Sequence, residues 1–256
     1  MVVLALFTDF GFDGPYVGQM KAVLHRDAPG VPVIDLMHDA PVFDPQSSAY
    51  LLAALAPEFP EGTIFVAVVD PGVGTDRRAL IAEIDGRWFV GPDNGLPAVL
   101  VRRADRARAW EIVWRPGRLT ASFHGRDLFA PVAARIAVEG RGAASGFGHE
   151  IDASELDQAD WPDELARIIY IDGFGNGISG LRAENLSPKH RILVHNVEIK
   201  GETTFASVPA GTVFWYGNSN GLVEIACNRG RADRHLNFGV GTAVEVIGNQ
   251  SVTAVI

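Results

Sequence analysis

The sequence has little cysteine, no long apolar run and no excess of basic residues. Its single cysteine, Cys227, excludes an intrachain disulfide and a zinc site made of several cysteines, as expected in a reducing cytoplasm. No apolar run approaches the ~20 residues of a membrane-spanning helix. With 31 acidic and 22 basic residues, the net charge is −9, and no basic stripe for nucleic acid or an anionic membrane is evident. We therefore expect a cytoplasmic protein that binds neither.

What is present is the composition of an ordinary globular protein. The 256 residues are 47% hydrophobic and 21% charged, which suffices for one large domain or two unequal ones. The first apolar run, VVLALF, has no basic residue before it and ends at Thr8 and Asp9. It is too short for the core of a signal peptide, so we interpret it as a buried strand.

The first half of the chain alternates short apolar runs with helical patterns, which favours a mainly parallel sheet covered on both faces. Expected strands are VVLALF, VPVIDL, TIFVAVVD, ALIAEI, RWFVG and ARAWEIVW, and expected helices are YVGQMKAVLH, PQSSAYLLAALA and DLFAPVAARIAV. We predict an α/β domain over residues 1–145 and, because residues 146–165 lack periodicity, a linker there.

The last part of the chain changes character. Its short β-prone runs are separated by Gly, Asn and Pro turns, which predicts a small antiparallel β-barrel-like domain over residues 166–256. These runs are ARIIYID, RILVHNVEI, GTVFWYG, LVEIAC, AVEVIG and SVTAVI.

Two segments of the first half carry the strongest chemical signal: VVDPGVGTDRR, with Asp70 and Arg77, and SFHGRDLFAP, with His124. Asp70 ends an apolar strand, and open α/β sheets place their ligands at the carboxyl edge. Each residue also has a simpler explanation, since an aspartate often caps a turn and a histidine often starts a helix. Arg78 competes with Arg77 and is interpreted as a surface charge.

Taken together, these segments resemble the S-adenosylmethionine (SAM) hydroxide adenosyltransferases, which form adenosine and methionine and are related to the SAM-dependent fluorinase and chlorinase. Further matching segments run in order along the chain: TDFGFDGPYVGQMKAV, FPEGTIF, GPDNG, IDGFGN and NSNGLVEIACNRG. The resemblance implies an α/β domain followed by a β-domain. It also implies SAM as substrate, with no cofactor and no metal.

The resemblance assigns roles residue by residue. Asp70, Arg77 and His124 are implied to activate the attacking water. The residues implied to hold the substrate are Asp9, Phe43, Asp172, Asn176, Ser219, Glu224 and Cys227. Asn220 departs from the arginine that some halogenating relatives carry beside the serine. Local explanations remain for several of these: a turn for Asp172 and Asn176, and a core position for Phe43.

Three alternatives to hydrolysis of SAM stay open. Several aspartates at strand ends suit Mg²⁺ or Ca²⁺, as in a metal-dependent nucleoside or phosphate hydrolase, although no DxD or HxH pair occurs there. The same pocket could serve a noncatalytic SAM or nucleoside sensor, or a halogenase. The resemblance also predicts a homotrimer with active sites between subunits. The implied site residues fall in both halves of the chain, a division that a single chain could equally accommodate.

Overall fold

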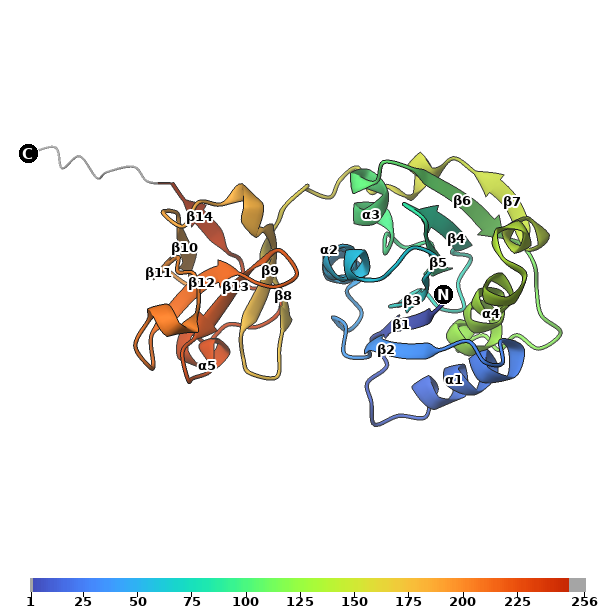
Figure 1. The fold of residues 1–256 in the computed structure, drawn as a ribbon, viewed down its shortest axis with the longest axis horizontal. Coiled ribbons are helices and arrows are strands. Elements are labelled where there is room, and N and C mark those ends of the chain that lie inside the picture. The colour runs from blue at the N-terminus through green and yellow to red at the C-terminus, as the bar shows by residue number, and fades with distance from the viewer. Residues whose placement is uncertain (1, 249–256) are drawn as a thin grey trace, which may run out of the picture. The chain divides into compact units, whose positions relative to one another are not determined.

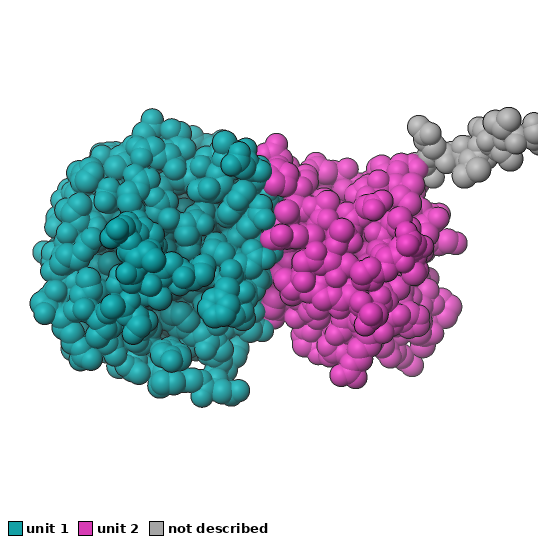
Figure 2. Space-filling view, turned by 180° about the vertical axis from the view of Figure 1, so that it is seen from behind, with its two compact units in different colours: residues 1–161 teal, residues 162–256 magenta. Residues whose placement is uncertain are grey.

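The structure, a computed structural model, describes residues 2–248. The chain divides into two compact units, residues 1–161 and residues 162–256 (Figures 1 and 2). Within the described residues, no helix is both long enough and apolar enough to cross a membrane.

The first unit is built on one mixed sheet of seven strands in the order β2-β1-β3-β5-β4-β6-β7. The strands β2, β1, β3 and β5 run parallel to one another, whereas β5, β4, β6 and β7 pair in antiparallel fashion. The prediction of a mainly parallel sheet is thus confirmed for the core of the sheet only. The strands are β1 (Leu4–Thr8), β2 (Val33–Met37), β3 (Ile64–Val68), β4 (Ala79–Ile84), β5 (Arg87–Pro92), β6 (Ala107–Ile112) and β7 (Gly148–Ile151).

Helices cover both faces of this sheet, which explains the unbroken apolar character of its central strands. Figure 1 shows α1 (Tyr16–Asp27) and α4 (Ala130–Glu139) on one face, and α2 (Pro45–Leu55) and α3 (Ala98–Arg103) on the other. Every residue of β1 and of β3 is buried. The carboxyl ends of these two strands therefore sit at the edge of a rigid, fully covered core.

The segment 146–165, expected as a linker, is structured over most of its length. Residues 148–151 form β7, which pairs with β6. Arg102 on α3 donates to Asp157 at 2.7 Å and to the carbonyl of Trp161 at 2.8 Å. These contacts attach the segment to the first unit as far as residue 161. Sequence periodicity misses them because they join an irregular stretch to a distant helix.

The second unit contains two antiparallel sheets, one of three strands (β11-β10-β14) and one of four (β12-β13-β9-β8). Over residues 162–248 the two sheets are separate and form no closed barrel. The antiparallel β character is therefore confirmed, and the barrel-like arrangement stays an unconfirmed prediction. Apolar side chains from both sheets, among them Ile192 and Val223, share one core. The elements are β8 (Leu165–Ile171), β9 (Gly177–Arg182), β10 (Arg191–Val194), β11 (Val197–Lys200), β12 (Val213–Gly217), β13 (Leu222–Cys227), α5 (Ala232–Leu236) and β14 (Glu245–Ile247).

Two details of this unit differ from the sequence pattern. The run RILVHNVEI is a hairpin rather than one strand, because His195 and Asn196 both have positive φ, as a two-residue turn between antiparallel strands requires. The sequence pattern predicts neither the strand β9 nor the helix α5. The run SVTAVI lies outside the described residues.

Candidate active site

Asp70 leaves the sheet two residues after the buried strand β3, and its side chain is only 5% exposed. The loop that follows returns the chain to β4. Gly74 in this loop has φ of +81°, and a Cβ there would lie 2.7 Å from the carbonyl oxygen of Ala121. This close approach brings the Asp70 loop against the segment that carries His124. The two segments singled out in the sequence therefore meet.

Arg77 forms a two-point ion pair with Asp70. Its Nε lies 2.8 and 3.0 Å from the two carboxylate oxygens, and its Nη2 also donates to Oδ2. The guanidinium carbon lies 5.3 Å from the centre of the Phe129 ring, and the side chain is 11% exposed. Planar pairing of this kind fixes the direction of both groups as well as their charge.

Arg77 also contacts His124. Its Nη2 donates a hydrogen bond to Nδ1 of His124 at 3.1 Å. Because a guanidinium only donates, Nδ1 must be unprotonated and the ring proton must reside on Nε2. Burial and, secondly, the charge of Arg77 lower the pKa of His124 below its ordinary value of 6.5. We therefore assign His124 as a neutral imidazole with a donor at Nε2.

His124 immediately precedes a π-helical turn, Gly125–Phe129, that leads into α4. Asp127 in this turn accepts from the backbone N–H and the hydroxyl of Thr120, at 2.9 and 2.6 Å, and from Arg126 at 2.6 Å. Burial opposes ionisation of Asp127, but these hydrogen bonds hold its pKa far below the usual value. A permanently charged Asp127 thus secures both ends of the segment that presents His124.

A cavity of about 350 Å³ opens beside these groups and is lined by Asp9, Phe43, Asp70 and His124, among others. The carboxylate of Asp9 accepts the backbone N–H of Phe43 at 3.1 Å, and burial raises the pKa of Asp9. Phe43 adopts φ of 56° and is 74% exposed. Such a conformation is costly for an aromatic residue, and the hydrogen bond from its backbone N–H to Asp9 helps to stabilise it.

Three more aromatic rings line the same cavity: Phe10, Tyr16 and Phe123. They pack edge to face or tilted against one another, with ring centres 5.3 to 5.9 Å apart. Aromatic faces attract cations and exclude water. The cavity therefore combines an aromatic wall with the carboxylates of Asp9 and Asp70 and the neutral imidazole of His124. Arg77 does not line it and acts on it through its hydrogen bonds to Asp70 and His124.

The five site residues expected in the second unit also share one cavity, of about 800 Å³: Asp172, Asn176, Ser219, Glu224 and Cys227. Asp172 accepts the backbone N–H groups of Phe174 and Asn176, both at 2.9 Å, and the side-chain amide of Asn176 at 3.0 Å. Its first function is thus to shape its own turn, as local sequence reasoning allowed. Ser219 is exposed at the cavity wall.

Glu224 is 5% exposed, and both its carboxylate oxygens are already bound. The Tyr216 hydroxyl donates to Oε1 at 2.7 Å and the Asn218 side chain to Oε2 at 3.1 Å. Burial and this hydrogen bond raise the pKa of Tyr216, so it remains a donor. Sequence reasoning missed both partners, although Tyr216 and Glu224 are paired across β12 and β13. Burial likewise raises the pKa of the Cys227 thiol.

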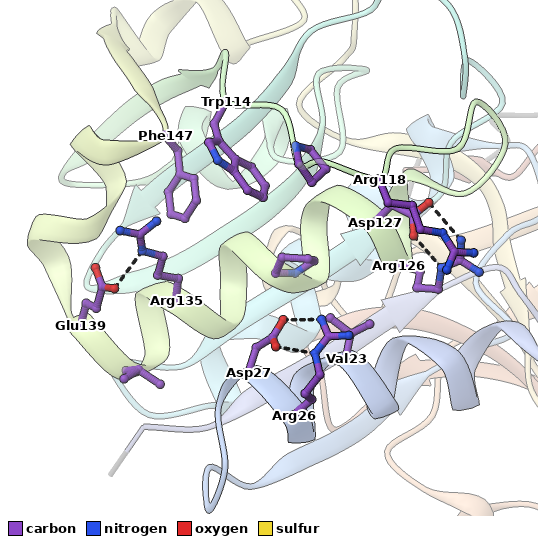
Figure 3. A pocket seen from close by; sticks show the side chains of 13 residues that line it. Val23, Arg26, Asp27, Trp114, Arg118, Arg126, Asp127, Arg135, Glu139 and Phe147 are labelled. Carbon is purple, nitrogen blue, oxygen red and sulfur yellow. Dashed lines mark hydrogen bonds and ion pairs between the residues drawn. The ribbon is translucent and has the colours of Figure 1, made fainter.

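A further cavity of the first unit, of about 570 Å³, is lined by several arginines and by Trp114 and Phe147 (Figure 3). Its acidic residues are each paired with an arginine of the same wall, as the dashed lines in Figure 3 show: Asp27 with Arg26, Asp127 with Arg126, and Glu139 with Arg135. None of the site residues predicted from the sequence lines this cavity, so it is a weaker candidate than the one beside Asp70. Among the described residues, no group of three His, Cys, Asp or Glu side chains is placed to hold a metal ion.

Comparison with known protein families gives the class that this fold and site define. The model of the SAM hydroxide adenosyltransferase N-terminal domain matches residues 4–146, and that of the C-terminal domain matches residues 166–245. The chain belongs to the SAM hydroxide adenosyltransferase family.

Individual relatives are similar over most of their length. An (R)-S-adenosyl-L-methionine hydrolase from Thermus thermophilus is 39% identical, with 94% of this chain and 97% of the relative covered. A fluorinase from Nocardia brasiliensis is 23% identical over 95% of this chain and 96% of its own. The crystal structure of an uncharacterised conserved protein from Thermotoga maritima has a TM-score of 0.85 and 29% identity, covering 96% of this chain and all of the other.

The assignment of His124 predicts an acid limb in the pH profile. Protonation at Nδ1 would place two donors, the His124 ring and the Arg77 Nη2, face to face. Since the pKa of His124 is lowered, kcat/KM should stay level at pH values above 6.5 and fall only as the pH drops through a pKa below 6.5.

The matched variant is His124→Asn, whose amide oxygen can accept from Arg77 without titrating. Its kcat/KM should be lower at all pH values and lack this limb. An unchanged acid limb in His124→Asn would assign the titration to another group.

Proposed function

We propose that this protein hydrolyses SAM to adenosine and L-methionine by attack of water on the ribose C5′ carbon. The observation that carries the proposal is that Arg77 joins Asp70 to His124 by hydrogen bonds, and that Asp70 and His124 both line an aromatic-walled cavity. The relatives at 34–39% identity are named (R)-S-adenosyl-L-methionine hydrolases, which supports the same reaction here.

The reaction requires an oriented nucleophile rather than a strong acid. The oxygen of water forms a bond to C5′ while the C5′–S bond breaks, and the electron pair of that bond stays on sulfur. Methionine leaves as a neutral thioether and needs no proton. Because the positive charge of the sulfonium disappears, a site with little water favours the transition state over the ground state.

Asp70, Arg77 and His124 have different roles toward the attacking water molecule. Asp70 accepts a hydrogen bond from the water and then its proton, a role typically worth ~10²–10⁴-fold in rate. Arg77 holds the carboxylate in one orientation through its two-point pair. His124, with its proton on Nε2, donates to the oxygen from another side and directs a lone pair toward C5′.

The remaining residues are proposed to hold SAM. Asp9 would accept the ribose hydroxyls, and the exposed ring of Phe43 would lie against the ribose and sulfonium. In the second unit, Asn176 and the backbone near Cys227 offer donors and acceptors to adenine, while Ser219 and Asp172 would contact the methionine carboxylate and ammonium. Glu224 would act indirectly by fixing Tyr216 and Asn218.

Neither a cofactor nor a metal ion is needed in this proposal, because the leaving group is already activated as a sulfonium. We also propose a cytoplasmic location, supported by the use of one cysteine in 256 residues.

The reaction is tested by incubating the protein with SAM in ¹⁸O-water, with EDTA and either fluoride or chloride present. Label should appear at the 5′ position of adenosine. No 5′-halo-5′-deoxyadenosine should form, because the Asp70 carboxylate can accept a hydrogen bond from water but offers a halide only an anionic oxygen. Mass spectrometry of the products measures both.

Four results would contradict the proposal. Free adenine would indicate cleavage at the wrong bond, a halogenated nucleoside would indicate a halogenase, and loss of activity in EDTA would indicate the metal-dependent alternative. Binding of SAM in calorimetry without turnover would favour a sensor. Following the names of its relatives, we expect the (R) sulfonium epimer to be consumed from an epimeric mixture.

The separate roles of two carboxylates give a second test. Asp70→Asn keeps the shape but loses the charge, so kcat should fall about 10²-fold or more with little change in KM. Asp9→Ala removes the ribose acceptor and should mainly raise KM. Steady-state kinetics distinguish these outcomes, and near-native kcat in Asp70→Asn would remove it as the water-activating group.

We further propose a homotrimer in which the α/β domain of one chain and the β-domain of its neighbour form each site. The support is the distribution of the proposed residues over two cavities, one in each unit. Closure of a cyclic assembly would also remove water from every site at once.

Complementation tests the shared site. Two inactive proteins, Asp70→Asn and Asn176→Ala, should regain part of the wild-type activity after subunit exchange, because some interfaces then combine two unmutated halves. Light scattering at assay concentration checks the oligomeric state. A fully active monomer, or proven exchange without recovery, would refute the shared site.

A further inference from the structure

The GPDNG segment, residues 91–95, has no role in the proposed chemistry, yet it contacts both flanks of the Asp70 loop. Asp93, 13% exposed, accepts a hydrogen bond from Nε of Arg78 at 2.7 Å. Its backbone N–H donates to the carbonyl of Arg78 at 3.0 Å. Asp93 thus binds both the side chain and the backbone of Arg78.

The backbone bond extends a strand ladder to the edge of the site. In the antiparallel pair of β4 and β5, Ala79 lies opposite Pro92, so Arg78 and Asp93 form the next pair. Arg78 is the residue directly after Arg77. The hydrogen-bonded ladder therefore continues to the residue next to Arg77, whose side chain binds Asp70.

The carbonyl of Arg78 has a second donor, Nη1 of Arg77, at 3.2 Å. The other nitrogens of Arg77 are directed at Asp70 and His124. The Arg78 carbonyl therefore sets the third point that defines the guanidinium plane. The backbone N–H of Asp93 donates to the same carbonyl, so a displacement of Arg78 would rotate Arg77 relative to Asp70.

The same segment also holds the approach to Asp70. The side-chain amide of Asn94 donates to the carbonyl of Val69, the residue before Asp70, at 2.7 Å. Gly91 packs so closely that a Cβ there would lie 2.2 Å from the carbonyl of Ala67. GPDNG therefore braces the loop at Val69 and at Arg78, which are the two points where it joins regular strands.

Arg78 has one more acidic partner, which provides an internal comparison. Glu155 accepts from Nη1 of Arg78 at 2.9 Å, but its side chain is 48% exposed and it makes no backbone contact with Arg78 among the hydrogen bonds described. Exposed pairs of this kind contribute little. If charge pairing alone mattered, loss of either acid would have similar effects.

We propose that Asp93 and Arg78 are positioning residues that set the orientation of the Arg77 guanidinium toward Asp70 and His124. The inference rests on the proposed hydrolysis of SAM and deepens it. Neither residue touches the reacting atoms; their contribution is to hold a reacting geometry in which an error of about 1 Å can cost ~10²-fold in rate.

Steady-state kinetics of Asp93→Asn and Arg78→Gln test this proposal, with Glu155→Gln as the matched control. Each of the first two should lower kcat by about 10-fold or more and leave KM for SAM within about threefold, since substrate contacts are unchanged. Asp93→Glu should recover part of the loss. Glu155→Gln should stay within about twofold of wild type in both constants.

The double variant tests whether Asp93 and Arg78 act through the same contact. The kcat of Asp93→Asn with Arg78→Gln should be no lower than that of the worse single variant, because both changes break the same contact. Multiplicative losses would overturn the proposal, as would an effect on KM alone or a kcat within twofold of wild type in folded Asp93→Asn. Thermal unfolding and binding of SAM confirm that each variant is folded.

An observation independent of turnover separates this proposal from the proposed function. In ¹H–¹⁵N spectra, the Arg77 Nε–H signal, assigned by its absence in Arg77→Lys, should be protected from exchange in wild type and in Glu155→Gln but not in Asp93→Asn. Unaltered protection in Asp93→Asn would overturn the positioning role. An inactive wild type with this pattern would refute hydrolysis of SAM and leave the positioning of Arg77 supported.

Discussion

The ion pair between Asp70 and Arg77 is the interaction on which the geometry of the first cavity depends. Both side chains are nearly excluded from solvent, so each would be costly without the other. Burial of the pair is compensated because the guanidinium donates to both carboxylate oxygens. Its remaining N–H groups donate to the Arg78 carbonyl and to His124. A flexible surface pair would supply the same charges without a fixed direction.

Neutral His124 follows from this pair. The guanidinium that binds Asp70 also donates to Nδ1, which places the imidazole proton on Nε2 and disfavours a second proton. Asp127, within the π-helical turn that follows His124, supports the arrangement by binding Thr120 and Arg126. The electrostatics of the cavity are thus ordered as carboxylate, guanidinium and neutral ring, with each group's state set by its neighbour.

The cavity of the second unit is organised differently. Its carboxylates serve first as acceptors for their own structure: Asp172 shapes the turn to Asn176, and Glu224 orients Tyr216 and Asn218. Ser219, Asn220 and Arg229 also line this cavity, so it presents a hydroxyl, an amide and a guanidinium besides the two carboxylates. Such a surface suits the edges of a purine or amino acid better than it suits the activation of water.

By itself, the sequence determined the α/β character of the first unit, the β character of the second and the membership of Asp70, Arg77 and His124 in one set. Apolar periodicity records the first two features locally, whereas the set of three residues was predicted from the resemblance of their segments to a known family. Tertiary structure alone decided that Gly74 meets Ala121, that residues 148–151 join the sheet, and that Asp93 binds Arg78 at its side chain and at its backbone. Those outcomes depend on contacts between residues far apart in the chain, where neither partner carries a local signal that names the other.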